Sequence, residues 1–207
     1  GGIDGTYRLL KNIMGLWLLQ ECRRCWALEG REYDYTGLVE MAAAAPAFTA
    51  VIDPDDPAFL APKHMPEAIA AWCEAHGQPV PPDDATLARV ILESLALRYR
   101  WTLTRLGELQ GRSFDRLYVL GGGSRNRLLC QLTADACRVA VTAGPVEATA
   151  IGNAALQAVA LGDLPSLAAA RALIHDSFAV EGYTPVTDGV TQARWEAAYA
   201  TFEGLVG

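Results

Sequence analysis

Leu117-Tyr118-Val119-Leu120-Gly121-Gly122-Gly123-Ser124-Arg125-Asn126 is the stretch that decides the fold, because an apolar run leads into three consecutive glycines. Residues 117–120 predict a buried strand, and residues 127–138 predict the helix that follows it. Glycines permit positive φ angles and let a flat ligand lie against the main chain. A strand, a glycine turn and a helix in this order are typical of nucleotide sites, although ordinary tight connections share the pattern.

The polar end of this stretch adds groups that could hold a nucleotide. Asn126 carries both a hydrogen-bond donor and an acceptor, which suits a ribose or the edge of an adenine. The first N–H groups of the following helix lack partners within the helix and favour an anion. We therefore predict that a nucleotide binds at Gly121, Gly122, Gly123 and Asn126, with a purely structural turn as the alternative.

A second strand-to-helix unit follows at GPVEATAIGNAA, residues 144–155, after a short strand predicted at 139–142. Pro145 suits the first turn of the expected helix. Its small residues would form a face that another backbone can approach closely: Gly152, Ala154, Ala155 and Ala158. We interpret this helix as a wall of the site and not as a source of catalytic groups.

The rest of the chain is predicted to be mostly helical. Residues 9–28 are apolar on nearly every side and predict a buried helix. Asp83 or Asp84 can cap a long helix that reaches Gln110. Other expected elements are helices at 34–45, 66–76, 166–175 and 191–202, a proline-rich loop at 52–66, and a possible third strand at 48–52.

Composition indicates a compact protein and limits its partners. The 207 residues are 51% hydrophobic and 20% charged, which is enough for one sizeable core. A net charge of -7 argues against nucleic acid as a partner. The sequence has no apolar run of the roughly 18 residues that a membrane span needs. Because the chain begins at Gly1 and lacks a signal-peptide pattern, we expect a fragment or a processed product of a longer chain. We expect a cytoplasmic protein, in keeping with cysteines that suit a reducing compartment.

The cysteines are interpreted as structural. Cys22-Arg23-Arg24-Cys25 has the spacing of redox and metal motifs, and neighbouring arginines would lower a thiol pKa. The pair lies late in a predicted helix, however, and no second pair has matching spacing for a metal. The total of five cysteines is odd, which also argues against a disulfide framework. We predict no metal site.

Three segments together resemble a known family. GGGSRN with LLCQLTADAC, then AGPVEATAIGNAALQA, and the opening YRLLKNIMGLWLLQECRR resemble the carboxy-terminal domain of the FGGY carbohydrate kinases, most closely their rhamnulokinase branch. The resemblance extends from residue 1 to about residue 185. It implies a helix-rich α/β domain of the actin-like, ribonuclease H-like ATPase fold. It also implies that the sheet is partly incomplete, because strands upstream of this chain are absent.

The resemblance implies roles for individual residues. Gly122 and Asn126 would hold adenosine, Gln20 would lie toward the phosphates, and Asn12 would lie near the sugar. From the residues alone, Asn12 and Gln20 could equally be satisfied amides at a helix boundary. The implied cofactors are ATP and Mg²⁺, and the implied acceptor is a sugar hydroxyl, of L-rhamnulose or a related ketose.

No residue of this sequence is a candidate catalytic base. By resemblance, the base and the phosphate-binding Asp-x-Gly-Thr hairpin belong to an amino-terminal kinase domain, which is the expected partner. Asp4-Gly5-Thr6 lacks the apolar strand that such a hairpin needs, so we interpret it as a solvated turn. Residues 1–207 are thus expected to form a single carboxy-terminal nucleotide-binding domain that is inactive alone. The alternative is a non-catalytic nucleotide-binding or interaction module of the actin-like superfamily.

Overall fold

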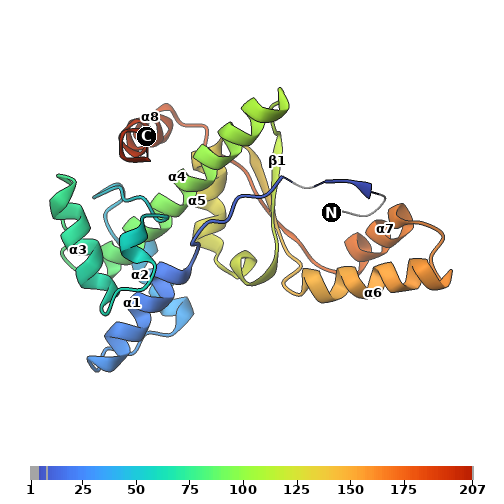
Figure 1. The fold of residues 1–207 in the computed structure, drawn as a ribbon, viewed down its shortest axis with the longest axis horizontal. Coiled ribbons are helices and arrows are strands. Elements are labelled where there is room, and N and C mark those ends of the chain that lie inside the picture. Colours follow the sequence, from blue (N-terminus) through green and yellow to red (C-terminus); the bar gives the residue numbers. More distant parts are fainter. Residues whose placement is uncertain (1–4, 8, 207) are drawn as a thin grey trace. The chain divides into compact units, whose positions relative to one another are not determined.

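The computed structural model describes residues 5–7 and 9–206. The chain divides into two compact units. We call Gly1–Phe114 with Thr187–Gly207 the helical unit, and Asp115–Val186 the sheet unit. Figure 1 shows the elements of both, and each unit is described by itself.

The helical unit is built around one long helix. Its elements are α1 (Trp17–Leu28), α2 (Tyr35–Ala44), the short 3₁₀ helix η2 (Pro57–Phe59), α3 (Met65–Ala75), α4 (Asp84–Gln110) and α8 (Gly189–Val206). Helices α1, α2 and α8 all pack on α4 (Figure 1). The core contains fully buried side chains from several of these helices, among them Leu18, Trp26, Ile69, Leu95 and Phe202.

Two helix starts in this unit were predictable from their capping residues. The Asp34 carboxylate accepts a 2.6 Å hydrogen bond from the Gly37 N–H at the start of α2. The Asp83 carboxylate accepts a 2.7 Å bond from the Thr86 N–H at the start of α4. Gly111, with φ of 63°, ends α4 in the left-handed conformation that favours glycine. The predicted helices at 34–45 and from Asp83 to Gln110 are confirmed.

The predicted helix at 9–28 is wrong in its first half. Helix α1 begins only at Trp17, and residues 9–14 have no regular structure. Gly15 is left-handed, with φ of 64°, which interrupts a helix at this point. The Met14 N–H donates to the Asp55 carboxylate, so a contact 41 residues away replaces the expected helical hydrogen bond.

The sheet unit contains a three-stranded sheet, three α-helices and one 3₁₀ helix. Its elements are β1 (Arg116–Val119), the 3₁₀ helix η3 (Gly121–Arg125), α5 (Arg127–Cys137), β2 (Ala140–Ala143), α6 (Ala148–Leu161), α7 (Leu167–Ser177) and β3 (Glu181–Tyr183). Strand β2 lies in the middle, parallel to β1 and antiparallel to β3. The register pairs Leu117 with Val141. Helix α5 connects two parallel neighbours, as a crossover connection must.

The core of the sheet unit lies between α5 and the sheet. Its buried residues are Cys130, Ala134, Val141 and Ala143, with Leu117, Val119 and Tyr183 packed against them. In β2, Val141 and Ala143 are buried, and the other residues of the strand are half-buried. Strand β1 lies at an edge of this sheet, where Tyr118 is 63% exposed, so the prediction of a buried first strand is wrong.

The third strand was predicted in the wrong place. Residues 48–52 form no strand because side chains take up their backbone N–H groups. The Val51 N–H donates to the Gln78 side chain and the Ile52 N–H donates to the Ser94 hydroxyl, both at 3.1 Å. The third strand is instead β3.

Helix α6 differs from its prediction at its start. Pro145 lies in the loop before the helix, not in its first turn, because α6 begins at Ala148. Helices α6 and α7 lie side by side (Figure 1), and within the described chain no residue of α6 is buried. No helix in residues 5–7 and 9–206 is long and apolar enough to cross a membrane.

Candidate functional site

The glycine loop after β1 is held against the loop after β2. Gly121 has φ of 74°, a conformation that favours glycine, and its N–H donates to the Pro145 carbonyl oxygen at 3.4 Å. In return, the Gly144 N–H donates to the Val119 carbonyl oxygen at 2.8 Å. The structure therefore brings the two predicted strand-to-helix motifs together at one end of the parallel strand pair, where ligands bind in open α/β sheets.

The three glycines differ in what a side chain would meet. A Cβ at Gly123 would contact the Val119 side chain at 3.7 Å, and one at Gly121 would lie 3.9 Å from the Val146 carbonyl oxygen. A Cβ at Gly122 would meet no atom within 4 Å, and Gly122 is exposed with an ordinary φ angle. The described chain itself thus leaves open space at Gly122, where a ligand can approach the backbone.

Asn126 has a structural role that the sequence interpretation missed. It is fully buried, and its side-chain oxygen accepts a 2.9 Å hydrogen bond from the Leu129 N–H at the start of α5. The signal was available, because asparagine is among the preferred residues at a helix N-cap. Asn126 therefore fixes the end of the glycine loop, whether or not its amide also contacts a ligand.

Two variants separate these roles of Asn126. Asn126→Ala removes the cap and is expected to lower the free energy of unfolding by about 1 kcal/mol. Asn126→Ser keeps an oxygen for the cap but removes the amide. In the full-length protein we expect nucleotide affinity, measured by calorimetry, to fall about tenfold in both variants. Denaturant unfolding should show a clear loss of stability only for Asn126→Ala. Wild-type affinity in Asn126→Ser would remove Asn126 from the nucleotide site.

A cavity of about 360 Å³ lies beside the glycine loop. Its lining includes residues from both loops and from the segment around β3: Ser124, Arg125, Arg127, Pro145, Val146 and Glu181. The volume is within the range of small-molecule sites. Sequence reasoning overlooked the two arginines of this lining, although they flank Asn126 in the motif itself.

The charges in this cavity are partly paired. Arg127 and Glu181 form an ion pair at 2.5 Å, and the Tyr183 hydroxyl donates to the other oxygen of Glu181 at 2.6 Å. The hydrogen bonds from Tyr183 and then Arg127 hold the pKa of Glu181 below its ordinary value. Glu181 is therefore an ionised partner of Arg127, and Arg125 adds a second guanidinium group at the exposed rim.

Asn12 and Gln20 belong to the helical unit, and the structure does not place them on one helix. Gln20 lies in the first turn of α1 with an exposed side chain. Asn12 is also exposed but lies in the irregular segment before α1, so the predicted helical spacing between the two is wrong. Lys11, in the same irregular segment, lies 3.3 Å from the Asp55 carboxylate. Asp4 of the Asp4-Gly5-Thr6 turn lies outside the described residues.

Within the described ranges, no group of three or more His, Cys, Asp or Glu residues could hold a metal ion. All five cysteines are free, and Cys22 and Cys25 are buried on α1. Burial raises the pKa of the Cys22 thiol far above its ordinary value, followed by smaller contributions from Cys25 and nearby carboxylates. A neutral buried thiol is neither a nucleophile nor a metal ligand.

This burial predicts low reactivity of Cys22 and Cys25 in the folded protein. In the folded protein at pH 8, we expect a thiol reagent such as DTNB to leave Cys22 and Cys25 unmodified, because both side chains are buried. For Cys22 the raised pKa also keeps the thiol in its unreactive, protonated form. After denaturation, both should react readily. The control is the half-buried Cys137, which we expect to react before them. Rapid labelling of Cys22 in native protein would contradict this assignment.

Solved structures of sugar kinases share this fold. The structure matches xylulose kinase from Rhodospirillum rubrum with a TM-score of 0.62 and 23% identity, covering 91% of this chain and 37% of that one. It matches Plasmodium falciparum glycerol kinase, solved with ADP, with a TM-score of 0.62 and 18% identity, covering 86% and 35%. The predicted actin-like ATPase fold is confirmed, here with a small, partial mixed sheet.

Sequence comparison identifies the family. Residues 1–161 match the FGGY family of carbohydrate kinases, C-terminal domain. The chain is 48% identical over 195 residues to a rhamnulokinase of Pectobacterium carotovorum, covering 94% of this chain and 38% of the relative. It is 45% identical over 206 residues to a rhamnulokinase of Bacteroides thetaiotaomicron, covering 100% and 41%. The chain belongs to the FGGY carbohydrate kinases, and it spans about two fifths of the length of these relatives.

Proposed function

We propose that this chain is the nucleotide-binding carboxy-terminal domain of an ATP-dependent carbohydrate kinase, whose amino-terminal domain supplies the catalytic base. The observation that carries the proposal is the glycine loop, which leaves open space at Gly122 and borders a cavity with two arginines. Family membership supports the reaction class. The whole residue range 1–207 acts as one domain in this proposal.

The residues fit the demands of phosphoryl transfer, in which a protein mainly positions groups and neutralises charge. The backbone of Gly121–Gly123 and the Asn126 amide would hold adenosine. Arg125 and Arg127 line the neighbouring cavity, which the three glycines and Asn126 do not line, and guanidinium groups can pair with phosphate or stack on a base. From the helical unit, Gln20 would lie toward the phosphates and Asn12 toward the sugar.

Mg²⁺ would enter with the ATP phosphates and neutralise their charge. The residues of the described chain do not form a cage for the ion, so we assign no magnesium ligand among them. Their part is to bind and orient the nucleotide.

The proposed acceptor is a hydroxyl of L-rhamnulose or a related ketose. The support comes from relatives named rhamnulokinase at 43–48% identity. A cytoplasmic location follows from this proposal, because that is where ATP and the sugar would meet. We propose neither nucleic acid nor membrane as a partner, given the net charge of -7.

Steady-state kinetics of the full-length protein test this proposal. Release of ADP with MgATP is measured for L-rhamnulose, L-fuculose, D-xylulose and glycerol. We expect kcat/KM for L-rhamnulose to exceed the others by about tenfold or more, because one unpaired polar group in a closed site rejects an analogue strongly. A preference for another of these acceptors would contradict the assignment of L-rhamnulose but would still support the assignment as a carbohydrate kinase. Nucleotide binding without turnover of any sugar would instead indicate a non-catalytic module.

A further inference from the structure

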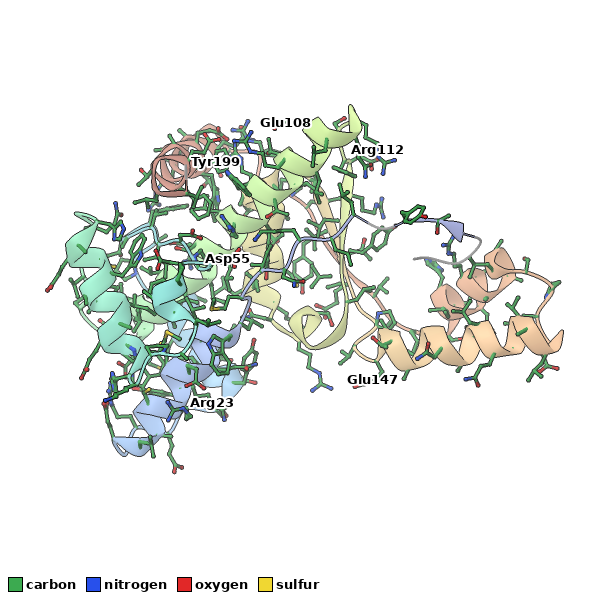
Figure 2. The ribbon with its side chains drawn as sticks, viewed as in Figure 1. Arg23, Asp55, Glu108, Arg112, Glu147 and Tyr199 are labelled. Atoms are coloured by element: carbon green, nitrogen blue, oxygen red, sulfur yellow. The ribbon has the colours of Figure 1, made fainter. Side chains whose placement is uncertain are left out.

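The irregular segment before α1 is attached to the helical unit by one carboxylate. Asp55 (labelled in Figure 2) accepts a 2.8 Å hydrogen bond from the Met14 N–H through Oδ1. Its Oδ2 lies 3.3 Å from the Lys11 ammonium. The two contacts lie on either side of Asn12. Asp55 thus holds the backbone that carries this side chain.

Asp55 is itself fixed in position and in charge. Arg98, only 7% exposed, donates to Asp55 Oδ2 from Nε at 2.9 Å and from Nη2 at 2.8 Å. The Asp55 N–H donates to the Asp53 carboxylate at 3.0 Å, which holds the turn. Burial raises the pKa of Asp55, but the bonds from Met14 and Arg98 outweigh it and hold the pKa below its ordinary value. The carboxylate therefore remains ionised near neutral pH.

Little else holds this segment. Leu9 and Leu10 are 53% and 81% exposed, so neither is a buried anchor of the segment. Ile13 and Met14 are only half-buried. Gly15 then turns the chain into α1 with a left-handed conformation. The position of Asn12 thus depends on the polar contacts of Asp55 more than on apolar packing.

Gln20 is held differently. It lies on α1, where Leu18, Leu19 and Cys22 are buried in the core of the helical unit. Helix α1 packs against α3 and α4 through this face. Loss of the Asp55 contacts would therefore free Asn12 while leaving Gln20 in place.

We propose that Asp55 is a positioning residue for sugar binding, which acts by fixing the segment that presents Asn12. The proposal rests on the proposed function, which places Asn12 toward the sugar. It predicts different effects on the two substrates: loss of the Asp55 carboxylate weakens sugar binding and leaves nucleotide binding unchanged. A residue that only stabilises the fold would affect both substrates together.

The test compares Asp55→Asn with Asp56→Asn in the full-length protein. Asp56 is a matched control, because it caps η2 and accepts a 2.9 Å bond from the Trp72 indole without a contact to the segment at 9–16. We expect Asp55→Asn to raise the sugar KM about tenfold and to change the ATP KM by less than about twofold. Asp56→Asn should change neither. Equal effects of the two variants, or equal effects on both substrates, would overturn the proposal.

Hydrogen exchange gives a readout that does not need activity. Backbone amides of residues 9–16 should exchange at least about fivefold faster in Asp55→Asn than in the wild type or Asp56→Asn, since the ion pairs of Oδ2 with Lys11 and Arg98, which fix the acceptor, are lost. Faster exchange with an unchanged sugar KM would show that the contact exists but does not position the sugar, and would overturn the proposal. If the wild type phosphorylates no sugar, the proposed function is wrong, and the role of Asp55 in sugar binding is wrong with it. Hydrogen exchange would then still show whether Asp55 holds residues 9–16.

Discussion

Gly122→Val in the full-length protein is expected to weaken nucleotide binding by about a hundredfold or more. A valine here meets open space in the protein, since a Cβ at Gly122 has no atom within 4 Å and the φ angle is ordinary. The fold should therefore tolerate the substitution. The added methyl groups would occupy the space that the nucleotide needs against the backbone. Titration calorimetry with MgADP measures the affinity, and denaturant unfolding checks the fold.

Gly182→Val is the matched control for this variant. Gly182 is also exposed, also in the sheet unit, and a Cβ there would likewise meet no atom within 4 Å. It lies in β3, where its side chain would point to the opposite face from Glu181 of the cavity. We expect wild-type affinity for Gly182→Val. Retained affinity in Gly122→Val would place the nucleotide elsewhere.

Residues 1–207 on their own are expected to transfer no phosphate to any sugar, with a rate at least about a thousandfold below that of the full-length protein. The carboxylate that lines the cavity is Glu181, and the bonds from Tyr183 and Arg127 lower its pKa. A carboxylate held in its ionised form in this way is a weak proton acceptor for a sugar hydroxyl. The base would come from the amino-terminal domain. Sugar-dependent ADP release is compared at equal concentrations of the two proteins, and robust turnover by residues 1–207 would refute this division of roles.

The elements that could be predicted are those determined by local chemistry. The Asp83 cap and Gly111 stop define α4, and the glycines after the apolar run mark the turn between β1 and α5. These signals act over a few residues, so tertiary contacts do not override them. The glycine loop was recognisable as a candidate site for the same reason, because its signal lies within a few consecutive residues.

The elements that were mispredicted depend on distant contacts. Residues 9–16 have a helical pattern, but the Asp55 carboxylate takes up the Met14 N–H instead. Residues 48–52 look like a strand, but the side chains of Gln78 and Ser94 take up their N–H groups. A partner 27 to 42 residues away leaves no local pattern in the sequence. Local propensity alone could not have resolved either segment.

The glycine loop of the candidate site could be predicted from the sequence, but the cavity beside it could not. The glycines and Asn126 were identified from their pattern, whereas the cap formed by Asn126 and the cavity beside it depend on how two loops meet. Arg125 and Arg127 line the cavity only because the loop after β2 and Glu181 complete it. The roles of Asn12 and Gln20 remain proposals that come from family resemblance.

Hydrogen exchange of the full-length protein with and without MgADP tests the central claim most directly. If the glycine loop holds the nucleotide, the backbone amides of residues 119–127 and of the facing loop at 143–147 should exchange more slowly in its presence. Protection confined to other segments, with these two loops unchanged at saturating nucleotide, would contradict the claim.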